Sequence, residues 1–247
     1  MIPIELRSVG NIRDLGGTRM KDGSVIRCGC LIRSAHLGYA VQADVQQLRN
    51  EYRLSKIIDL RTGGERSELP DHSFGVENLR LPIFPEFKAG ISHEAQEEKK
   101  SDLPRMEDLY RFIMTDTACV TGFRNILKAI FTHDYRKGSV LWHCSEGKDR
   151  CGMTAALVLT ALGADRETIL EDYLETNKVN IPKARAMYEQ VLAEKGPAVA
   201  ENIYQAYIAD ENYLYAAWEV MGDNYLRDTL GFSAAQIRKF RSQVLEE

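Results

Sequence analysis

The sequence predicts an α/β protein with a central, mostly parallel sheet flanked by helices, a helical lid or insertion, and a helical C-terminal half. Two observations carry this prediction. Short apolar runs typical of strands alternate with helical patterns early in the chain, and the sequence after Gly152 has helical periodicity almost throughout. Because no repeat, low-complexity tract or Pro/Gly/Ser-rich linker divides the chain, residues 1–247 are predicted to form a single domain.

The first part of the chain is predicted to supply the strands. The run "VIRCGCLIRS" (25–34) follows a "KDG" turn and alternates like a strand, which indicates a hairpin. Further strands are expected at "LSKIIDLRT" (54–62), "ENLRLPIF" (77–84) and "SVLWHC" (139–144), and a helix at "VQADVQQLRNEY" (41–52). The breaker-rich "GGERSELPD" (63–71) predicts a loop.

Residues 86–116 are polar and dense in charge, which predicts either a solvated surface segment or a lid over a site. The apolar spacing of "CVTGFRNILKAIFTH" (119–133) then predicts a helix. Later helices are expected at 152–163, 165–177, 182–196, 197–222 and 233–247. Asp165 and Ser233 occupy N-cap positions, and Gly196 and Gly222 are expected to end helices.

The composition limits the partners of this chain. Hydrophobic residues make up 44% of the 247 residues and charged residues 28%, and the formal net charge is −4. This balance provides no basic face for a nucleic acid backbone, so nucleic acid is not an expected partner. The N-terminal residues lack a secretory signal, and no apolar run is long enough for a transmembrane segment. We therefore expect a cytoplasmic protein, unless a leader has been removed or export uses another signal.

The cysteines and histidines do not predict a disulfide framework or a metal site. The number of cysteines, five, is odd, and a chain of this length does not need disulfide bonds to be stable. Cys28 and Cys30 lack a second, well-spaced Cys/His pair and are expected to be strand residues, and Cys119 is expected in the core. The histidines show no mutual spacing that suggests a metal, so no metal or other cofactor is expected.

The turn "HCSEGKDRCG" (143–152) is the most informative stretch, because it connects a predicted strand to an apolar helix. In this geometry backbone N–H groups converge at the positive end of the helix dipole and favour an anion. Five residues separate Cys144 from Arg150, enough to wrap a phosphate-sized oxyanion, and the glycines allow close backbone approach and tight helix packing. The predicted phosphate-binding residues are Ser145, Glu146, Gly147, Lys148, Asp149 and Arg150.

The same field favours a thiolate nucleophile at Cys144, because a helix N-terminus and nearby cations lower the pKa of a thiol. Attack on phosphorus gives a thiophosphate and divides hydrolysis into two easier displacements. Arg150 offers a planar fork for two phosphoryl oxygens, with Lys148 as a supporting charge. Asp149 is the carboxyl group nearest in sequence and the expected general acid, and Asp71 is the alternative from another loop.

These residues resemble a known family. The C-x5-R spacing is that of the cysteine-based phosphatases, and the turn is similar to the H-C-x-x-G-K-D-R-x-G loop of the atypical bacterial tyrosine and lipid phosphatases. Further segments resemble that family at "NIRDLGG" (11–17), "IIDLRTGGE" (57–65), "DYLETN" (172–177) and "YLRDTLGFS" (225–233). The resemblance implies one α/β domain with a helical lid, no metal, and hydrolysis of phosphotyrosine, often of phosphoserine or phosphothreonine, and in some members of phosphoinositides. It also implies Cys144 as nucleophile, Arg150 as phosphate clamp and Asp149 as general acid.

Two positions depart from the family pattern. Cys151 stands where a Thr is expected, and its thiol is a weaker hydrogen-bond donor to the thiolate. This predicts slower turnover, or a reversible disulfide with an oxidised Cys144. Glu146 stands where an Ala is familiar, and its negative charge predicts a preference for singly phosphorylated peptides over polyanionic lipid headgroups.

Several supporting candidates have two interpretations each. Asp59 and Arg61 end a predicted strand and either contact the loop or substrate or form an ordinary salt bridge. Arg13 and Asp14 either support the site or fix a turn. His143 is expected to orient the loop through a structural hydrogen bond rather than to transfer a proton.

The predicted function is that of a phosphomonoester hydrolase, a cysteine-dependent protein tyrosine phosphatase with or without dual specificity. A phosphoinositide phosphatase is the alternative within the enzyme class, and an inactive phosphate-binding adaptor is the alternative outside it. The adaptor is disfavoured because binding alone requires no nucleophile. The expected partners are a phosphorylated protein or phosphoinositide substrate and a phosphate or other oxyanion in the loop; the oligomeric state is not predicted.

Overall fold

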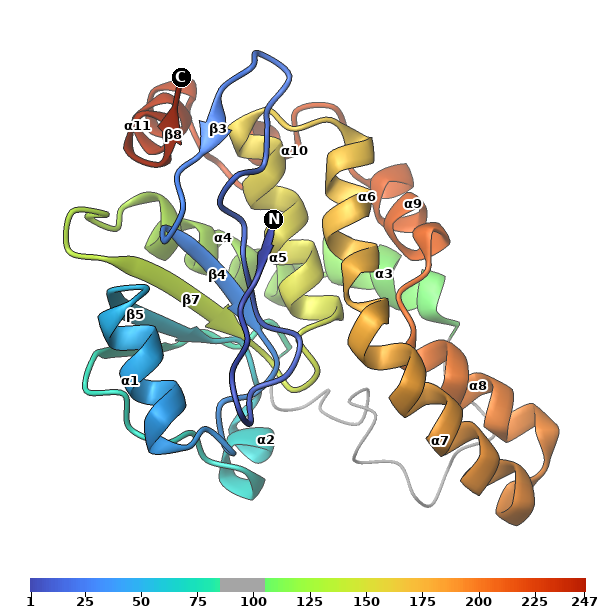
Figure 1. The fold of residues 1–247 in the computed structure, drawn as a ribbon. Coiled ribbons are helices and arrows are strands. Elements are labelled where there is room, and N and C mark those ends of the chain that lie inside the picture. The colour runs from blue at the N-terminus through green and yellow to red at the C-terminus, as the bar shows by residue number, and fades with distance from the viewer. Residues whose placement is uncertain (85–104) are drawn as a thin grey trace.

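The computed structural model describes residues 1–84 and 105–247. Its main sheet has six strands in the order β1-β2-β4-β7-β5-β6, and a separate pair is formed by β3 and β8 (Figure 1). The strands are β1 (Ile2–Pro3), β2 (Arg13–Asp14), β3 (Val25–Ile26), β4 (Leu31–Ser34), β5 (Leu54–Asp59), β6 (Glu77–Arg80), β7 (Ser139–His143) and β8 (Leu245–Glu246). The β4–β7, β7–β5 and β5–β6 pairs are parallel, whereas β1 and β2 extend the sheet in antiparallel orientation. The predicted mostly parallel sheet is confirmed.

Helices surround this sheet, and α6 to α9 gather on one side of it, at the right in Figure 1. The helices are α1 (Gln42–Asn50), α2 (Gly63–Glu68), α3 (Met106–Thr115), α4 (Thr117–Phe131), α5 (Asp149–Leu162), α6 (Arg166–Glu175), α7 (Asn177–Lys195), α8 (Pro197–Tyr207), α9 (Glu211–Val220), α10 (Tyr225–Asp228) and α11 (Ala234–Val244). The helical C-terminal half is therefore confirmed, with the short strand β8 at its end. Among the described helices, none combines the length and apolarity needed to cross a membrane.

The two faces of the sheet are buried against different partners, because successive strand residues point to opposite faces. On one face, Ile32, Leu141 and Ile57 pack with α1 and the N-terminal segment. On the other face, Trp142 and Ile58 pack with α3, α4, α5 and α11. Burial on both faces explains the apolar run of the central strand β7, whereas the edge strand β6 is polar and mostly exposed.

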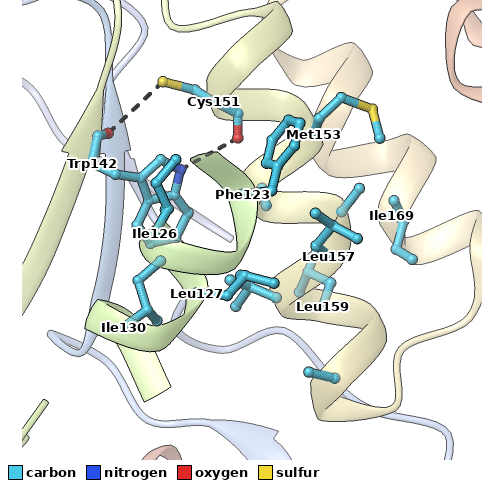
Figure 2. Close-up of a cluster of buried hydrophobic side chains, with 14 of the residues drawn as sticks. Phe123, Ile126, Leu127, Ile130, Trp142, Cys151, Met153, Leu157, Leu159 and Ile169 are labelled. Atoms are coloured by element: carbon cyan, nitrogen blue, oxygen red, sulfur yellow. Dashed lines mark hydrogen bonds between the residues drawn. The ribbon is translucent and has the colours of Figure 1, made fainter. Parts of the chain in front are cut away.

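The core beneath the turn at 143–152 is built by α4 and α5 against β7 (Figure 2). The packed side chains include Phe123, Ile126, Leu127 and Ile130 of α4, and Met153, Leu157 and Leu159 of α5. Within this core the indole N–H of Trp142 donates a hydrogen bond to the carbonyl of Cys151 at 3.3 Å (Figure 2). This bond joins the end of β7 to the first turn of α5 and so braces the turn between them.

Two predicted elements in the first part of the chain are wrong. The strand expected at 25–34 is divided into β3 and β4, because Gly29 adopts a positive φ of 70° and interrupts the extended backbone. The loop expected at 63–71 contains helix α2, which begins with a capping box. The Thr62 N–H donates to the Glu65 carboxylate at 2.8 Å, and the Glu65 N–H donates to the Thr62 hydroxyl at 3.3 Å.

The charged segment expected at 86–116 lies mostly outside the described residues. Its last part, from residue 105, is described, and it is not a solvated insertion. Helix α3 begins there at Met106 and buries Leu109, Tyr110 and Ile113 in the main core. The apolar spacing of these residues, rather than the charges that precede them, decides the structure of this part.

The helical boundaries in the second half agree with the capping signals only in part. Asp165 and Ser233 cap α6 and α11, and Gly196 ends α7, as predicted. The long helix expected at 197–222 is two helices, because Asp210 caps a new helix by accepting from the Asn212 N–H. Helix α9 ends at Val220, before Gly222.

Candidate active site

The turn between β7 and α5 lies at the carboxyl ends of the parallel strands, where open α/β sheets place their ligand sites. Segments that follow the two neighbouring strands hold it from both sides. The N–H of His36, after β4, donates to the Ser145 carbonyl at 3.0 Å, and the N–H of Leu60, after β5, donates to the His143 carbonyl at 2.9 Å. We call residues 144–150 the phosphate loop.

Gly147 is the point where the phosphate loop contacts β4. It adopts a positive φ of 69°, and a Cβ there would lie 2.7 Å from backbone atoms of Ser34 and Ala35. Its carbonyl accepts a hydrogen bond from Arg33 at 2.7 Å. Only glycine satisfies both the left-handed backbone and this close approach.

The Cys144 sulfur lies at the base of the phosphate loop and is buried. The backbone N–H of Gly147 donates to it at 3.2 Å. Burial acts to raise the pKa of this thiol, but a hydrogen bond from the Cys151 thiol and the positive charge of Arg150 outweigh it and lower the pKa from 9.0 to about 6. Cys144 is therefore a thiolate at neutral pH.

Cys151 takes part in the site although it stands where a Thr is expected. Its side chain is fully buried, and its thiol lies 3.6 Å from the Ser34 carbonyl and 4.0 Å from the Trp142 carbonyl. Burial and the hydrogen bond to Cys144 raise the pKa of Cys151 well above its usual value. The Cys151 thiol thus stays protonated, and its single proton is available either to the Cys144 thiolate or to the carbonyls of Ser34 and Trp142.

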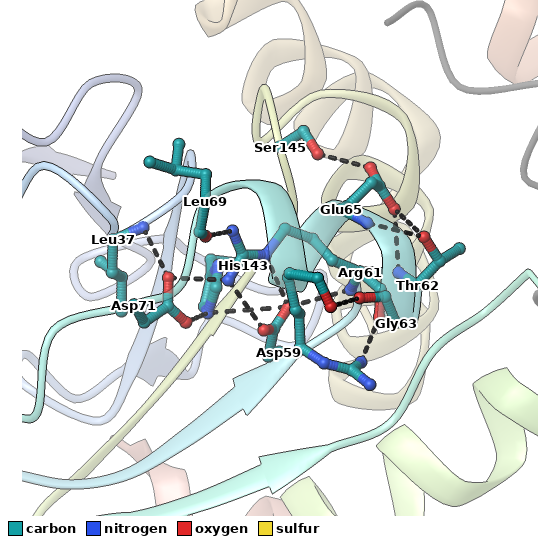
Figure 3. Close-up of polar contacts among 12 residues, drawn as sticks. Leu37, Asp59, Arg61, Thr62, Gly63, Glu65, Leu69, Asp71, His143 and Ser145 are labelled. Atoms are coloured by element: carbon teal, nitrogen blue, oxygen red, sulfur yellow. Dashed lines mark hydrogen bonds and ion pairs between the residues drawn. The ribbon is translucent and has the colours of Figure 1, made fainter. Parts of the chain in front are cut away.

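Arg150 is held by a carboxylate from another loop. Its two terminal nitrogens donate to the Glu65 carboxylate at 2.7 and 2.6 Å, and one of them also lies 3.3 Å from the Ser145 hydroxyl. The Ser145 hydroxyl in turn donates to Glu65 at 2.5 Å (Figure 3). Burial opposes ionisation of Glu65, but its bonds to Arg150 and Ser145 lower its pKa to about 2. These contacts use three of the five N–H donors of the guanidinium.

Lys148 directs its side chain to the end of helix α8. Its ammonium donates to the carbonyls of Ala206 at 2.5 Å and Ile208 at 3.0 Å, and lies 3.2 Å from Asp149. Burial lowers the pKa of Lys148, and the Asp149 charge counteracts this in part. A cation at a helix C-terminus is favourable, so Lys148 joins the phosphate loop to the α7–α8 pair.

Asp149, the first residue of α5, is oriented by a chain of tyrosine hydroxyls. The Tyr110 hydroxyl donates to Asp149 Oδ1 at 2.7 Å and lies 2.6 Å from the Tyr173 hydroxyl. Burial and the Asp149 charge raise the pKa of Tyr110 well above its usual value, so Tyr110 remains a donor. The carboxyl group of Asp149 is therefore held at the loop by α3 and by Lys148.

Asp59, Arg61, Asp71 and His143 form one buried polar cluster behind the loop (Figure 3). Arg61 donates to Asp59 at 3.0 and 2.9 Å and pairs with Asp71 at 2.8 Å. His143 Nε2 lies 3.0 Å from Asp71. The salt-bridge interpretation of Asp59 and Arg61 is thus the one that the structure favours, and His143 lies beside Asp71 at the end of β7.

The same cluster contains the one group of potential metal ligands found among the described residues. Ligand atoms of Asp59, Asp71 and His143 all lie within 4.8 Å of one another. Arg61 bonds to both carboxylates and already supplies a positive charge there. The guanidinium of Arg61 is therefore the cation that these two carboxylates bind in this structure.

A second buried network joins the N-terminal segment to the phosphate loop. Arg13 donates to Asp172 at 2.8 Å, and Arg33 pairs with the other oxygen of Asp172 while bonding to the Gly147 carbonyl. Asn11 accepts from Arg13 at 2.7 Å and donates to the Glu146 carbonyl at 3.0 Å. Arg13 therefore supports the loop through its partners.

Asp14, the neighbour of Arg13, fixes a turn. Its two carboxylate oxygens accept from the N–H groups of Gly16 at 2.9 Å and Gly29 at 2.5 Å. Of the two predicted interpretations, the turn applies to Asp14 and the support of the site applies to Arg13.

Glu146 reaches out of the loop to helix α7. Its carboxylate pairs with the ammonium of Lys183 at 3.2 Å, and both side chains are partly exposed. The negative charge that the sequence places in the phosphate loop is therefore matched by a cation on the neighbouring helix.

Sequence reasoning missed several residues that hold the site, above all Glu65, Asp172, Arg33 and Tyr110. The segments containing Glu65 and Asp172 were noted as similar to the family, yet their partners lie 85 and 139 residues away along the chain. Buried charges require partners, but Glu65 and Asp172 stand in polar segments, "GGERSE" and "LEDYLE", so nothing in the local sequence marks them as buried.

Together, a doubly flanked parallel sheet and a strand–loop–helix turn with a thiolate, an arginine and converging backbone groups define a cysteine-based phosphatase. A sequence model of the tyrosine phosphatase family matches residues 4–246. This chain belongs to that family, and it is a cysteine-dependent protein tyrosine phosphatase.

Similar proteins are found among characterised sequences and structures. A Cupriavidus necator protein whose name places it among the tyrosine-protein phosphatases is 28% identical over 94% of this chain and 85% of its own length. The triple specificity protein phosphatase PtpB of Mycobacterium tuberculosis is 27% identical, over 98% of each chain. The solved structure of a kinase associated phosphatase with its catalytic cysteine replaced by serine covers 93% of this chain and 99% of its own, at 15% identity and a TM-score of 0.44.

Proposed function

We propose that this phosphatase hydrolyses phosphomonoesters, phosphotyrosine in peptides foremost, through a covalent intermediate on Cys144. The observation that carries the proposal is the state of the Cys144 sulfur. It accepts the Gly147 N–H at 3.2 Å, and its pKa of about 6 makes it a thiolate at neutral pH. A buried thiolate at a helix N-terminus is the nucleophile that phosphoryl transfer requires.

In the first step the Cys144 thiolate attacks phosphorus, an S–P bond forms, and the P–O bond to the leaving group breaks. Arg150 and the backbone N–H groups of the loop stabilise the charge on the equatorial oxygens. Asp149 gives its proton to the leaving oxygen, so that an alcohol or phenol departs rather than an alkoxide or phenoxide.

In the second step water attacks the thiophosphate. Asp149, now a carboxylate, accepts a proton from that water, the S–P bond breaks, and inorganic phosphate and the Cys144 thiolate are released. The hydrogen bond from Cys151 and the charge of Arg150 make the thiolate a good leaving group, because they stabilise its charged form.

The position of Asp149 in the loop supports it over Asp71. The contacts alone do not separate the two acids, because Asp149 also has a cation beside it, Lys148 at 3.2 Å, and accepts a hydrogen bond from Tyr110. The Asp71 carboxylate pairs with Arg61 and His143 and also accepts the Leu37 N–H at 3.2 Å. Burial opposes its ionisation, but His143 and Arg61 lower its pKa below the usual value, so it stays ionised and poorly suited to give a proton. Asp149 lies in the loop itself, five residues after the nucleophile.

The range of substrates follows from the same site. One relative is named a triple specificity protein phosphatase, which supports a range of substrates wider than phosphotyrosine. The family resemblance indicates phosphoserine and phosphothreonine as the additional substrates. A phosphoinositide phosphatase remains the second candidate.

The proposal is tested by hydrolysis of an aryl phosphate in the presence of a metal chelator. Wild-type protein should release phosphate, and Cys144→Ser should lose activity by at least about a thousand-fold, because a serine hydroxyl remains protonated at the same position. An inactive wild type, or equal rates for both proteins, would overturn the mechanism.

A further inference from the structure

The cations of the phosphate loop are already paired with carboxylates of the chain. In the described residues, Arg150 pairs with Glu65, Lys148 with Asp149, and Lys183 with Glu146. Arg33, which bonds to the loop at Gly147, shares Asp172 with Arg13. Among the described residues each of these cations therefore already has a carboxylate partner, so the backbone N–H groups and the helix dipole supply much of the attraction that the loop offers an anion.

Glu146 determines the balance of positive and negative charge at the outer edge of the loop, because it pairs with Lys183. Its backbone is fixed, because its carbonyl accepts from Asn11 at 3.0 Å. Its side chain turns outward to Lys183, and these two side chains are 27% and 47% exposed, so solvent and ligands reach both. The other pairs named above are more deeply buried.

Lys183 is therefore a cation beside the loop that can bind a ligand once its contact with Glu146 is lost. It lies on α7 one residue before the buried Ala184, which fixes the helix at that point. While Glu146 holds the ammonium at 3.2 Å, a second phosphate on a substrate meets a satisfied lysine and a carboxylate of its own sign. The negative charge of Glu146 then repels a second phosphate placed beside it and disfavours its binding.

We propose that Glu146 and Lys183 form a specificity-determining pair that selects substrates carrying a single phosphate and disfavours substrates with closely spaced phosphates. The selected class is a phosphomonoester on an otherwise uncharged group, such as a phosphotyrosine side chain. This inference rests on the proposed function, because it concerns the ligand of the same loop. It also revises the expectation from the sequence that the charge of Glu146 alone favours singly phosphorylated peptides. In the structure Glu146 is paired with Lys183, and the pair determines this preference.

The test compares the dissociation constants of inorganic phosphate and pyrophosphate, measured by calorimetry on the full chain. Glu146→Gln should tighten pyrophosphate binding relative to phosphate binding by roughly five-fold, which is the scale of one partly exposed charge pair. The double variant Glu146→Gln/Lys183→Gln should lose this gain, because the released lysine is then absent. Glu77→Gln is the matched control, since it removes an exposed carboxylate that pairs with Lys56 at 3.3 Å, at the start of β6 and away from the loop.

An unchanged ratio in Glu146→Gln, or an equal change in Glu77→Gln, would overturn the proposal. If the double variant still binds pyrophosphate more tightly relative to phosphate, Lys183 has no part in selecting the substrate, and the proposed role of the pair is wrong. Because both measurements are of binding, a protein that binds these anions but does not hydrolyse an aryl phosphate would contradict the proposed function separately.

Discussion

The Glu65 carboxylate accepts hydrogen bonds from both terminal nitrogens of Arg150, at 2.7 and 2.6 Å, and both side chains are buried. Glu65 is also the residue that closes the capping box of α2 with Thr62. The Glu65 carboxylate therefore orients the Arg150 guanidinium and also fixes the start of α2, the helix to which Glu65 belongs. The position of Arg150 depends on the β5–α2 turn as much as on its own loop.

Replacing Glu65 with Gln should misplace Arg150. We expect kcat/KM for an aryl phosphate to fall by on the order of a hundred-fold, because small errors in the position of a catalytic group cost about that much. The thermal unfolding midpoint should fall as well, since a buried arginine loses the charge that pairs with it.

Glu68→Gln is the control for this variant, because Glu68 lies exposed on the same helix. It should retain both the activity and the unfolding midpoint of the wild type. Equal activity in Glu65→Gln and the wild type would contradict a positioning role for Glu65.

The reactivity of Cys144 should follow its pKa. The rate of alkylation by iodoacetate should rise with pH and reach half its maximum near pH 6, where the thiolate forms in the folded protein. Cys151→Ala removes the hydrogen bond from the Cys151 thiol and should move this midpoint upward. A midpoint that remains near that of an ordinary thiol in the wild type would contradict the assigned thiolate.

The same lowered pKa makes folding stability depend on pH. The folded protein ionises Cys144 at about pH 6, whereas the unfolded chain does so near pH 9, so the unfolded state holds more protons between these values. The stabilisation is complete above pH 9 and is lost as the pH falls towards 6. Denaturant unfolding of wild type and Cys144→Ser should therefore give a difference in free energy that grows in favour of the wild type from pH 6 to pH 9.

Asp149→Asn should slow the step in which the leaving group is protonated. We expect kcat to fall by roughly a hundred-fold or more with a poor leaving group, and much less with an activated aryl phosphate that needs no proton. Asp71→Asn should show no such dependence on the leaving group, because the Asp71 carboxylate is already bound by Arg61 and lies beside His143. The reverse pattern would assign the acid to Asp71.

The phosphate loop could be predicted from the sequence because its chemistry is local. Five residues separate Cys144 from Arg150, and the strand and helix that flank them have strong apolar patterns. The residues that position the loop could not be predicted, because their contacts are set by packing. Glu65 meets Arg150 across 85 residues, and Lys148, which seemed a phosphate ligand, turns to α8 because carbonyls at that helix end need a donor.

Cys151 should protect Cys144 from irreversible oxidation. Peroxide converts the Cys144 thiolate to a sulfenic acid and is itself reduced; the Cys151 thiol then attacks that sulfur, water leaves, and a disulfide forms. After peroxide treatment of the wild type, mass spectrometry should find a peptide that links the two cysteines, and dithiothreitol should restore activity. In Cys151→Ser no partner is available, so oxidation should proceed to the sulfinic acid and recovery should be lost. Cys28→Ser, which removes an exposed thiol, should behave like the wild type. Full recovery in Cys151→Ser, or no linked peptide in the wild type, would show that Cys151 acts only as a hydrogen-bond donor to the thiolate.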